Sequence, residues 1–147
     1  MRDVQEGARV IGLQVHVLKA STIDEIDAAF ATFSRERPDA LFVGPDAFFS
    51  SRRVQFVILA AHHRIPAAYS LRDHVAAGGL MSYGPNVADS YRLVGSYTGR
   101  ILRGEKPADL PVQQVTKLDL AINITTAKAL GLTIPETLLA TADEVIQ

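Results

Sequence analysis

Cysteine is absent from this chain of 147 residues. That absence excludes disulfides, thiolate catalysis, and zinc or iron–sulfur sites that are held by cysteine. Charge is nearly balanced, with 15 Lys and Arg against 16 Asp and Glu and a formal net charge of -1, so nothing draws the chain to nucleic acid or to an anionic membrane. No apolar run reaches the roughly 18 residues that a membrane helix needs. Residues 1–12 carry charges throughout, which is unlike a signal peptide.

The motifs of the common enzyme classes are also missing. The sequence contains no G-x-G-x-x-G, no Walker A motif, no G-x-S-x-G and no H-E-x-x-H. His62 and His63 are adjacent, and adjacent side chains point apart on a helix, so we expect no metal site there. The sequence therefore predicts a protein without catalysis and without a cofactor.

What the sequence does have is a hydrophobic content of 48% and a regular alternation of helix and strand patterns. Short apolar or alternating runs predict strands at residues 13–18, 40–44, 65–69, 80–83 and 117–124. Amphipathic runs predict helices between them, and also before the first strand and after the last. Such an alternation is typical of an α/β fold, a parallel sheet flanked by helices. The stretch 104–115 has two prolines and is expected to be an extended crossing segment.

Polar residues mark the expected starts of the helices. Thr22 and Glu25 have capping-box spacing, with Glu25 placed to reach back to the Thr22 amide. Residues 70–73 form a second box with Asp in place of Glu, and Ser50 or Ser51 is expected to cap the helix that follows them. Further along, Asn86 is the expected cap of a long helix, and Pro135 opens the last helix. Val54, Val57, Ile58 and Ala61 share one side of the helix after residue 51.

An ordered set of segments resembles the C-terminal part of ABC-transporter substrate-binding proteins of the tryptophan/tyrosine type. The segments are GLQVHVL (12–18), DEIDAAF (24–30), LFVGPDAFF (41–49), IPAAY (65–69), AAGGLMSYGPNVADSYRL (76–93), RILRGEKPADLP (100–111) and INITTAKALGLTIP (122–135). The resemblance implies the type I periplasmic-binding-protein fold, in which two lobes close on a solute that is passed to a membrane permease. It also implies a small solute, such as an aromatic amino acid, and a periplasmic location. Because no signal peptide is visible, a cytoplasmic location stays open as the alternative.

Family members of this kind are about twice as long, and their first lobe has no counterpart here. The resemblance therefore divides the chain into a second-lobe core without its first strand (1–79), a strand and helix that belong to the first lobe in the family (80–104), and a crossing segment with a late strand and the C-terminal helices (105–147). On this basis the segment from residue 80 is expected away from residues 13–70. Its apolar face then needs another partner, and we expect a homodimer.

Ligands of open α/β sheets bind beyond the carboxyl ends of the strands, where three loops of this chain are expected to meet. The richest loop, residues 44–52, is expected to open onto the largest concave surface. Asp46 suits an amine, the aromatic rings offer apolar surface, and the serines and an arginine suit a carboxylate. The predicted ligand-binding residues are Asp46, Phe48, Phe49, Ser50, Ser51, Arg52, Tyr69, Arg72 and Tyr83. The alternative is structural: Asp46 and Ser50 cap the helix, and Phe48 and Phe49 belong to the core.

The sequence thus predicts a solute-binding component of an ABC importer, with a small-molecule solute, the permease and a second copy of the chain as partners. Binding by this chain alone is expected to be weak, because one lobe leaves the solute half solvated. The alternative is a stand-alone α/β sensor or interaction domain that oligomerises. An enzyme of flavodoxin-like shape ranks last because no motif supports it.

Overall fold

The computed structural model describes residues 2–114 and 117–147. The chain divides into two compact units, residues 1–36 and residues 37–147.

The first unit begins with helix α1 (Arg2–Val10), and Gly12, two residues after its end, has a positive φ of 75°. The expected helix is therefore confirmed. The strand expected at residues 13–18 is wrong, because these residues lie in irregular backbone. Alternating side chains do not make a strand unless a neighbouring strand takes up the backbone hydrogen bonds, and none pairs with this segment among the described residues.

Helix α2 (Ile23–Glu36) forms where the capping box predicts it. The Glu25 amide donates to Thr22 Oγ1 over 3.2 Å, and the Glu25 carboxylate accepts from the Ser21 amide at 2.6 Å. The Glu25 carboxylate therefore binds the amide of Ser21, one residue before the predicted amide of Thr22. Ile26, Phe30 and Phe33 recur at spacings of four and three and form the buried face.

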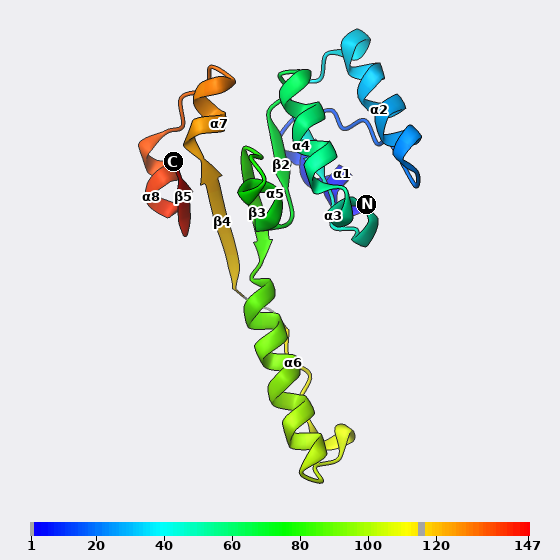
Figure 1. Cartoon of the computed structure of the whole chain (residues 1–147), viewed down its shortest axis with the longest axis vertical. Helices are drawn as coiled ribbons and strands as arrows, with labels where there is room; N and C mark the ends of the chain where they lie inside the picture. Colours follow the sequence, from blue (N-terminus) through cyan, green and yellow to red (C-terminus); the bar gives the residue numbers. More distant parts are fainter. Residues whose placement is uncertain (1, 115–116) are drawn as a thin grey trace. The chain divides into compact units, whose positions relative to one another are not determined.

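The second unit contains a five-stranded sheet in the order β1-β2-β3-β4-β5. The strands are β1 (Leu41–Val43), β2 (Ala67–Tyr69), β3 (Met81–Pro85), β4 (Leu118–Asn123) and β5 (Glu144–Ile146), and Figure 1 labels β2 to β5. The pairs β1–β2, β2–β3 and β4–β5 are parallel, while β3–β4 is antiparallel. The α/β class and the mostly parallel sheet are as predicted, and β5 is an addition that the sequence did not reveal.

Helices of this unit separate the strands along the chain. They are α3 (Ala47–Ser51), α4 (Arg53–His62), α5 (Arg72–Ala76), α6 (Val87–Leu102), α7 (Ile124–Ala129) and α8 (Glu136–Thr141), with a 3₁₀ turn at Pro107–Asp109. The core of this unit includes Val57 of α4, Val75 of α5 and Ala127 of α7, which are buried, as is Tyr69 of β2. The sheet is not covered evenly, since Phe42 in the middle of β1 remains 55% exposed.

Several expected local features differ from the structure. The N-cap of α4 is Arg52, which makes no side-chain cap bond, so the expected serine cap of this helix is wrong. The hydroxyls of Ser50 and Ser51 donate instead to the carbonyls of Asp46 and Phe48, and Asp46 caps the preceding helix α3. The N-cap of α5 is Leu71, which has no side-chain bond, so the second capping box is wrong. The buried face of α4 is formed by Phe56, Val57 and Ala60, whereas Val54 and Ile58 are exposed.

The strand from residue 81 corrects the expected placement of its segment. Tyr69 of β2 pairs in register with Ser82 of β3, so this strand lies in one sheet with β1 and β2 rather than away from them. The following helix α6 begins at Asn86, whose side chain accepts from the Asp89 amide at 3.0 Å as predicted. Every residue of α6 is described and none of them is buried. The assignment of this helix to another lobe therefore stays a prediction.

Candidate functional site

A cavity of about 440 Å³ opens at the carboxyl ends of β2 and β3. Because β4 runs antiparallel to β3, its first residues reach the same edge of the sheet, and the start of β5 lies beside them. The cavity is lined by Leu71, Arg72, Asp73, Gly84, Pro85, Asn86, Val87, Ala88, Lys117, Asp119, Leu120, Ala121, Asp143 and Glu144. Its position agrees with the general placement of ligand sites in open α/β sheets.

The turn after β2 and the end of β3 approach each other closely at this cavity. A Cβ built on Gly84 would lie 2.0 Å from the carbonyl oxygen of Ser70, so only glycine fits at this position. The close approach brings the start of α5 and the start of α6 to one site. Arg72 and Asp73 come from the first helix, and Asn86 caps the second.

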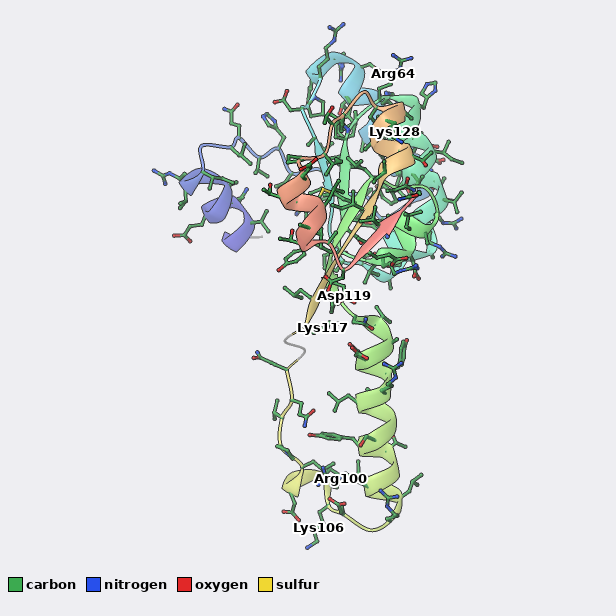
Figure 2. All side chains as sticks on the ribbon, turned by 90° about the vertical axis from the view of Figure 1, so that its left-hand side faces the viewer. Arg64, Arg100, Lys106, Lys117, Asp119 and Lys128 are labelled. Atoms are coloured by element: carbon green, nitrogen blue, oxygen red, sulfur yellow. The ribbon has the colours of Figure 1, made fainter. Side chains whose placement is uncertain are left out.

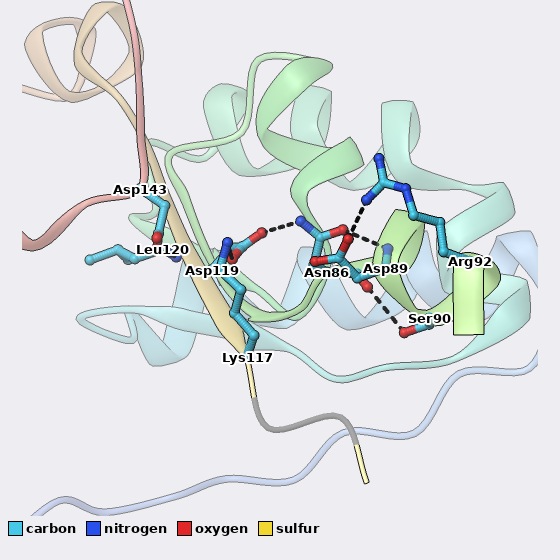
Figure 3. Close-up of polar contacts among 8 residues, drawn as sticks. All are labelled: Asn86, Asp89, Ser90, Arg92, Lys117, Asp119, Leu120 and Asp143. Carbon is cyan, nitrogen blue, oxygen red and sulfur yellow. Dashed lines mark hydrogen bonds and ion pairs between the residues drawn. The ribbon is translucent and has the colours of Figure 1, made fainter. Parts of the chain in front are cut away.

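Asn86 links three elements at one side of the cavity (Figure 3). Its Nδ2 donates to Asp119 Oδ2 at 2.5 Å, its Oδ1 accepts from the Asp89 amide, and its carbonyl accepts from the Ser90 hydroxyl at 3.0 Å. The helix cap is thus bonded across the cavity to the start of β4. An amide in this role holds α6 and β4 together without placing a charge there.

Lys117 and Asp119 stand at the start of β4, as Figure 2 shows. Lys117 Nζ lies 3.4 Å from Asp119 Oδ1, so one carboxylate meets both a cation and the Asn86 amide. Nearby, Asp143 Oδ2 accepts from the Leu120 amide at 2.9 Å, and the Asp143 amide donates to the Leu120 carbonyl. These bonds fix the carboxylate of Asp143 at the start of β5.

Arg72 and Glu144 form an ion pair across the cavity wall. Arg72 Nε donates to Glu144 Oε2 and Nη2 donates to Oε1, so the contact is bidentate. This hydrogen bonding raises the pKa of the Arg72 guanidinium and lowers the pKa of the Glu144 carboxyl. The two side chains remain 55% and 37% exposed, and the pair is therefore solvated.

Counting the lining residues gives two cations, Arg72 and Lys117, against the four carboxylates of Asp73, Asp119, Asp143 and Glu144. The formal charge of the cavity wall is therefore two minus four, or -2. Both cations are already paired with carboxylates of the chain itself. A wall of this composition attracts a positively charged group and can also hold an anionic group if one of the pairs opens.

Of the predicted ligand-binding residues, only Arg72 lines this cavity. Tyr69 is 1% exposed and lines a second cavity of about 100 Å³ between α4 and α7, while Tyr83 is 58% exposed. The loop that includes Asp46 lines neither of these two cavities. The prediction that this loop opens onto the largest concave surface therefore gains no support, and its role in binding stays a prediction.

The loop itself is a helix start. Asp46 Oδ1 accepts from the amides of Phe48 at 2.8 Å and Phe49 at 3.2 Å, which is the capping role of the structural alternative. Phe48 and Phe49 are half-buried, Phe49 packs edge-on against Phe56 at 5.1 Å, and the Arg52 guanidinium lies 5.9 Å from the Phe48 ring centre. The rings of Phe48 and Phe49 are thus neither fully buried in the core nor fully exposed to solvent.

Sequence reasoning missed Asp119, Asp143 and Glu144 as cavity residues. They come to the site because β4 is antiparallel and β5 pairs with it, and neither feature was predicted. Asn86 was predicted as a helix cap and lies in residues 83–86, one of the three loops expected beyond the carboxyl ends of the strands, but it was not among the predicted ligand-binding residues. Among residues 2–114 and 117–147, no group of three or more His, Asp or Glu side chains could hold a metal ion.

Comparison with known proteins decides the family. Residues 1–146 match the family described as ABC transporter substrate binding protein. This chain belongs to that family. Substrate-binding proteins hold a solute without changing it, which confirms the prediction that the chain is not an enzyme. No protein with curated annotation matches the chain.

Solved structures agree with this assignment. An ABC domain from Streptococcus pneumoniae in complex with L-Trp is 30% identical with a TM-score of 0.88, and the match covers 99% of this chain and 50% of that one. A conserved domain protein from Vibrio cholerae is 26% identical with a TM-score of 0.89, covering 99% and 49%. A ligand-free, open substrate-binding protein from Clostridium difficile is 24% identical with a TM-score of 0.68 and supports the fold alone.

This substrate-binding chain therefore spans about half the length of the solved relatives that it matches. In the part of the chain that the structure describes, no helix has both the length and the apolar character to cross a bilayer.

Proposed function

We propose that this chain is the solute-binding component, or part of it, of an ABC importer, and that its solute is an amino acid, preferably an aromatic one. The solute binds at the carboxyl edge of the sheet and is delivered to a membrane permease. The family assignment supports the importer, and the L-Trp bound to the Streptococcus pneumoniae relative supports the class of solute. A periplasmic location belongs to the same proposal.

The observation that carries the choice of solute is the charge arrangement of the 440 Å³ cavity. Its wall has an excess of carboxylates for an ammonium group, and the Arg72 guanidinium suits a carboxylate. Cavities of roughly 300–1,000 Å³ accept small molecules of this size. Of the predicted ligand-binding residues, Arg72 belongs to this cavity, whereas a binding role for Asp46, Phe48, Phe49, Ser50, Ser51, Arg52, Tyr69 and Tyr83 stays a separate prediction because they do not line it.

The second part of the proposal is that the chain forms a homodimer. The alternative function, a stand-alone interaction domain that oligomerises, requires the same association. The observation in its favour is α6, where Val87, Tyr91, Val94, Ile101 and Leu102 are each at least 40% exposed. A net charge of -1 offers little repulsion between copies. Binding of the solute by this chain alone is proposed to be weaker than micromolar, since a site that encloses only part of a solute leaves polar groups solvated.

A thermal-shift screen with the twenty amino acids tests the proposed function. A ligand present at a hundred times its dissociation constant stabilises the folded chain by about 2.7 kcal/mol, which is a clear shift of the melting temperature. We expect a shift with L-tryptophan, L-tyrosine or L-phenylalanine at millimolar concentration and none with a neutral sugar at the same concentration. If no amino acid shifts the melting temperature, the proposed solute class is wrong. Calorimetry then measures the affinity, and a sub-micromolar constant for the monomer would contradict weak binding.

A further inference from the structure

The Glu144 carboxylate accepts hydrogen bonds from the Arg72 guanidinium in the same way that the carboxylate of a bound solute would. Its two oxygens accept from Nε and Nη2, which is the fork-to-fork geometry by which arginine recognises carboxylates in general. Both side chains line the 440 Å³ cavity. We propose that Glu144 is a built-in competitor for the carboxylate of the solute, and that a zwitterion binds by inserting itself into the Arg72–Glu144 pair. This inference rests on the proposed function because it concerns the same cavity.

The pair can open at small cost. Arg72 is 55% exposed and Glu144 is 37% exposed, and exposed ion pairs add little net stability because water solvates both partners. The other cation of the cavity has a different geometry. Lys117 is 63% exposed and makes a single contact of 3.4 Å with Asp119, whose carboxylate also accepts from Asn86. Arg72 is therefore the cation whose planar fork matches a carboxylate.

Release of the Glu144 side chain leaves its strand in place. β5 is held to β4 by the backbone pairing of Ala121 with Glu144 and of Ile122 with Val145. Asp143, directly before Glu144, is bonded to Leu120 through both its amide and its carboxylate. The Glu144 side chain can thus leave Arg72 without unpairing the sheet.

Insertion of a zwitterion keeps every charge paired. Before binding, the guanidinium meets the Glu144 carboxylate; after binding, it meets the solute's carboxylate, and Glu144 meets the solute's ammonium group. A solute with only a carboxylate leaves Glu144 unpaired in the cavity, and a solute with only an amine leaves Arg72 unpaired. Unpaired charges in a partly enclosed site are unfavourable. The pair therefore selects amino acids against both kinds of monopolar analogue.

Three ligands with the same indole ring separate the contribution of the solute's carboxylate from that of its ammonium group. They are L-tryptophan, indole-3-propionate without the amine, and tryptamine without the carboxylate. Each is titrated by calorimetry against the wild-type chain and two cavity variants, with folding checked by circular dichroism. In Glu144→Gln we expect indole-3-propionate to bind at least fivefold more tightly and tryptamine at least fivefold more weakly. In Arg72→Gln we expect the opposite, because Glu144 becomes free for an amine.

A matched ion pair outside the cavity supplies the control. Arg100 and Glu105 are 2.6 Å apart and are exposed to a similar degree, at 35% and 44%. In Glu105→Gln all three affinities should stay within twofold of the wild type. If the wild type binds L-tryptophan but Glu144→Gln moves both analogues by less than twofold, or moves both in the same direction, the competitor role is wrong and the proposed function stands. If the wild type binds none of the three, the proposed function fails, and the competitor role falls with it.

Discussion

Tyr69 and His74 form a buried pair of polar rings next to the candidate site. Their ring centres are 4.6 Å apart at an interplanar angle of 17°, and the residues are 1% and 2% exposed. The tyrosine hydroxyl and both imidazole nitrogens have no hydrogen-bond partner among the described residues. Burial raises the pKa of Tyr69 to about 12 and lowers the pKa of His74, so both rings are neutral at pH 7.

The lowered pKa of His74 makes the stability of the fold depend on pH. Burial is the largest cause, the backbone of Leu71 and the charge of Asp73 oppose it, Arg53 adds to it, and the net effect holds the pKa of His74 below its ordinary value of 6.5. As the pH falls through 6.5, the unfolded chain takes up the proton first. Neutral His74 therefore contributes its full share of the free energy of unfolding above pH 6.5. That contribution is lost progressively as the pH falls from 6.5 to the pKa of His74 in the folded chain. The loss is at most about 1.4 kcal/mol per pH unit.

His74→Phe keeps a ring against Tyr69 and removes the titration. We expect its free energy of unfolding, measured with urea, to fall less than that of the wild type between pH 7.5 and pH 5.5. His62 lies at the exposed end of α4, and His62→Gln should keep the wild-type dependence. An equal pH dependence in wild type and His74→Phe would show that His74 does not titrate differently in the two states.

At the scale of single elements, variants of Asp46 at the N-cap of α3 distinguish a structural role of this residue from a ligand-binding role. The carboxylate accepts two amides of the first turn, and loss of such a cap costs about 1 kcal/mol. Asp46→Ala should lower the free energy of unfolding by about that amount, whereas Asp46→Asn should retain it because Asn caps equally well. If Asp46 also binds an amine, Asp46→Asn loses affinity for L-tryptophan at unchanged stability. An unchanged affinity in Asp46→Asn would leave the cap as its role.

Elements with strong local signals could be predicted from the sequence. The capping residues Thr22 and Asn86, and Gly131 with its positive φ of 74°, mark helix ends where the structure has them. Apolar runs also predicted β1 to β4. These signals act within a few residues, so no knowledge of the rest of the fold is required.

Features that depend on distant partners could not be predicted in this way. Residues 13–18 alternate like a strand, yet pairing decides whether a strand forms. The antiparallel direction of β4 and the addition of β5 follow from tertiary pairing, and with them Asp119, Asp143 and Glu144 enter the candidate site. Arg72 was predicted because it lies in the short segment that follows the end of β2, at the start of α5, a position that local order alone identifies.

At the scale of the whole molecule, α6 raises the question of what its apolar side chains meet. Tyr91 is 73% exposed, Val94 is 60% exposed and Leu102 is 81% exposed, and all three lie on one side of the helix. Each buried methylene or ring contributes free energy at about 25 cal/mol per Å² of apolar surface removed from water. Exposed apolar patches of this kind are typical of interaction surfaces.

We expect the chain to form a dimer in which α6 of one copy packs against the second copy. Multi-angle light scattering at micromolar concentration should give twice the mass of one chain. Val94→Glu places a charge in the apolar face and should return the chain to the monomer, because burying an unpaired carboxylate is costly. Ser96→Glu adds the same charge two residues away, on the other side of α6, and should leave the dimer intact. A wild-type monomer at these concentrations would contradict the dimer, and a dimer that survives Val94→Glu would place the interface on another surface of the chain.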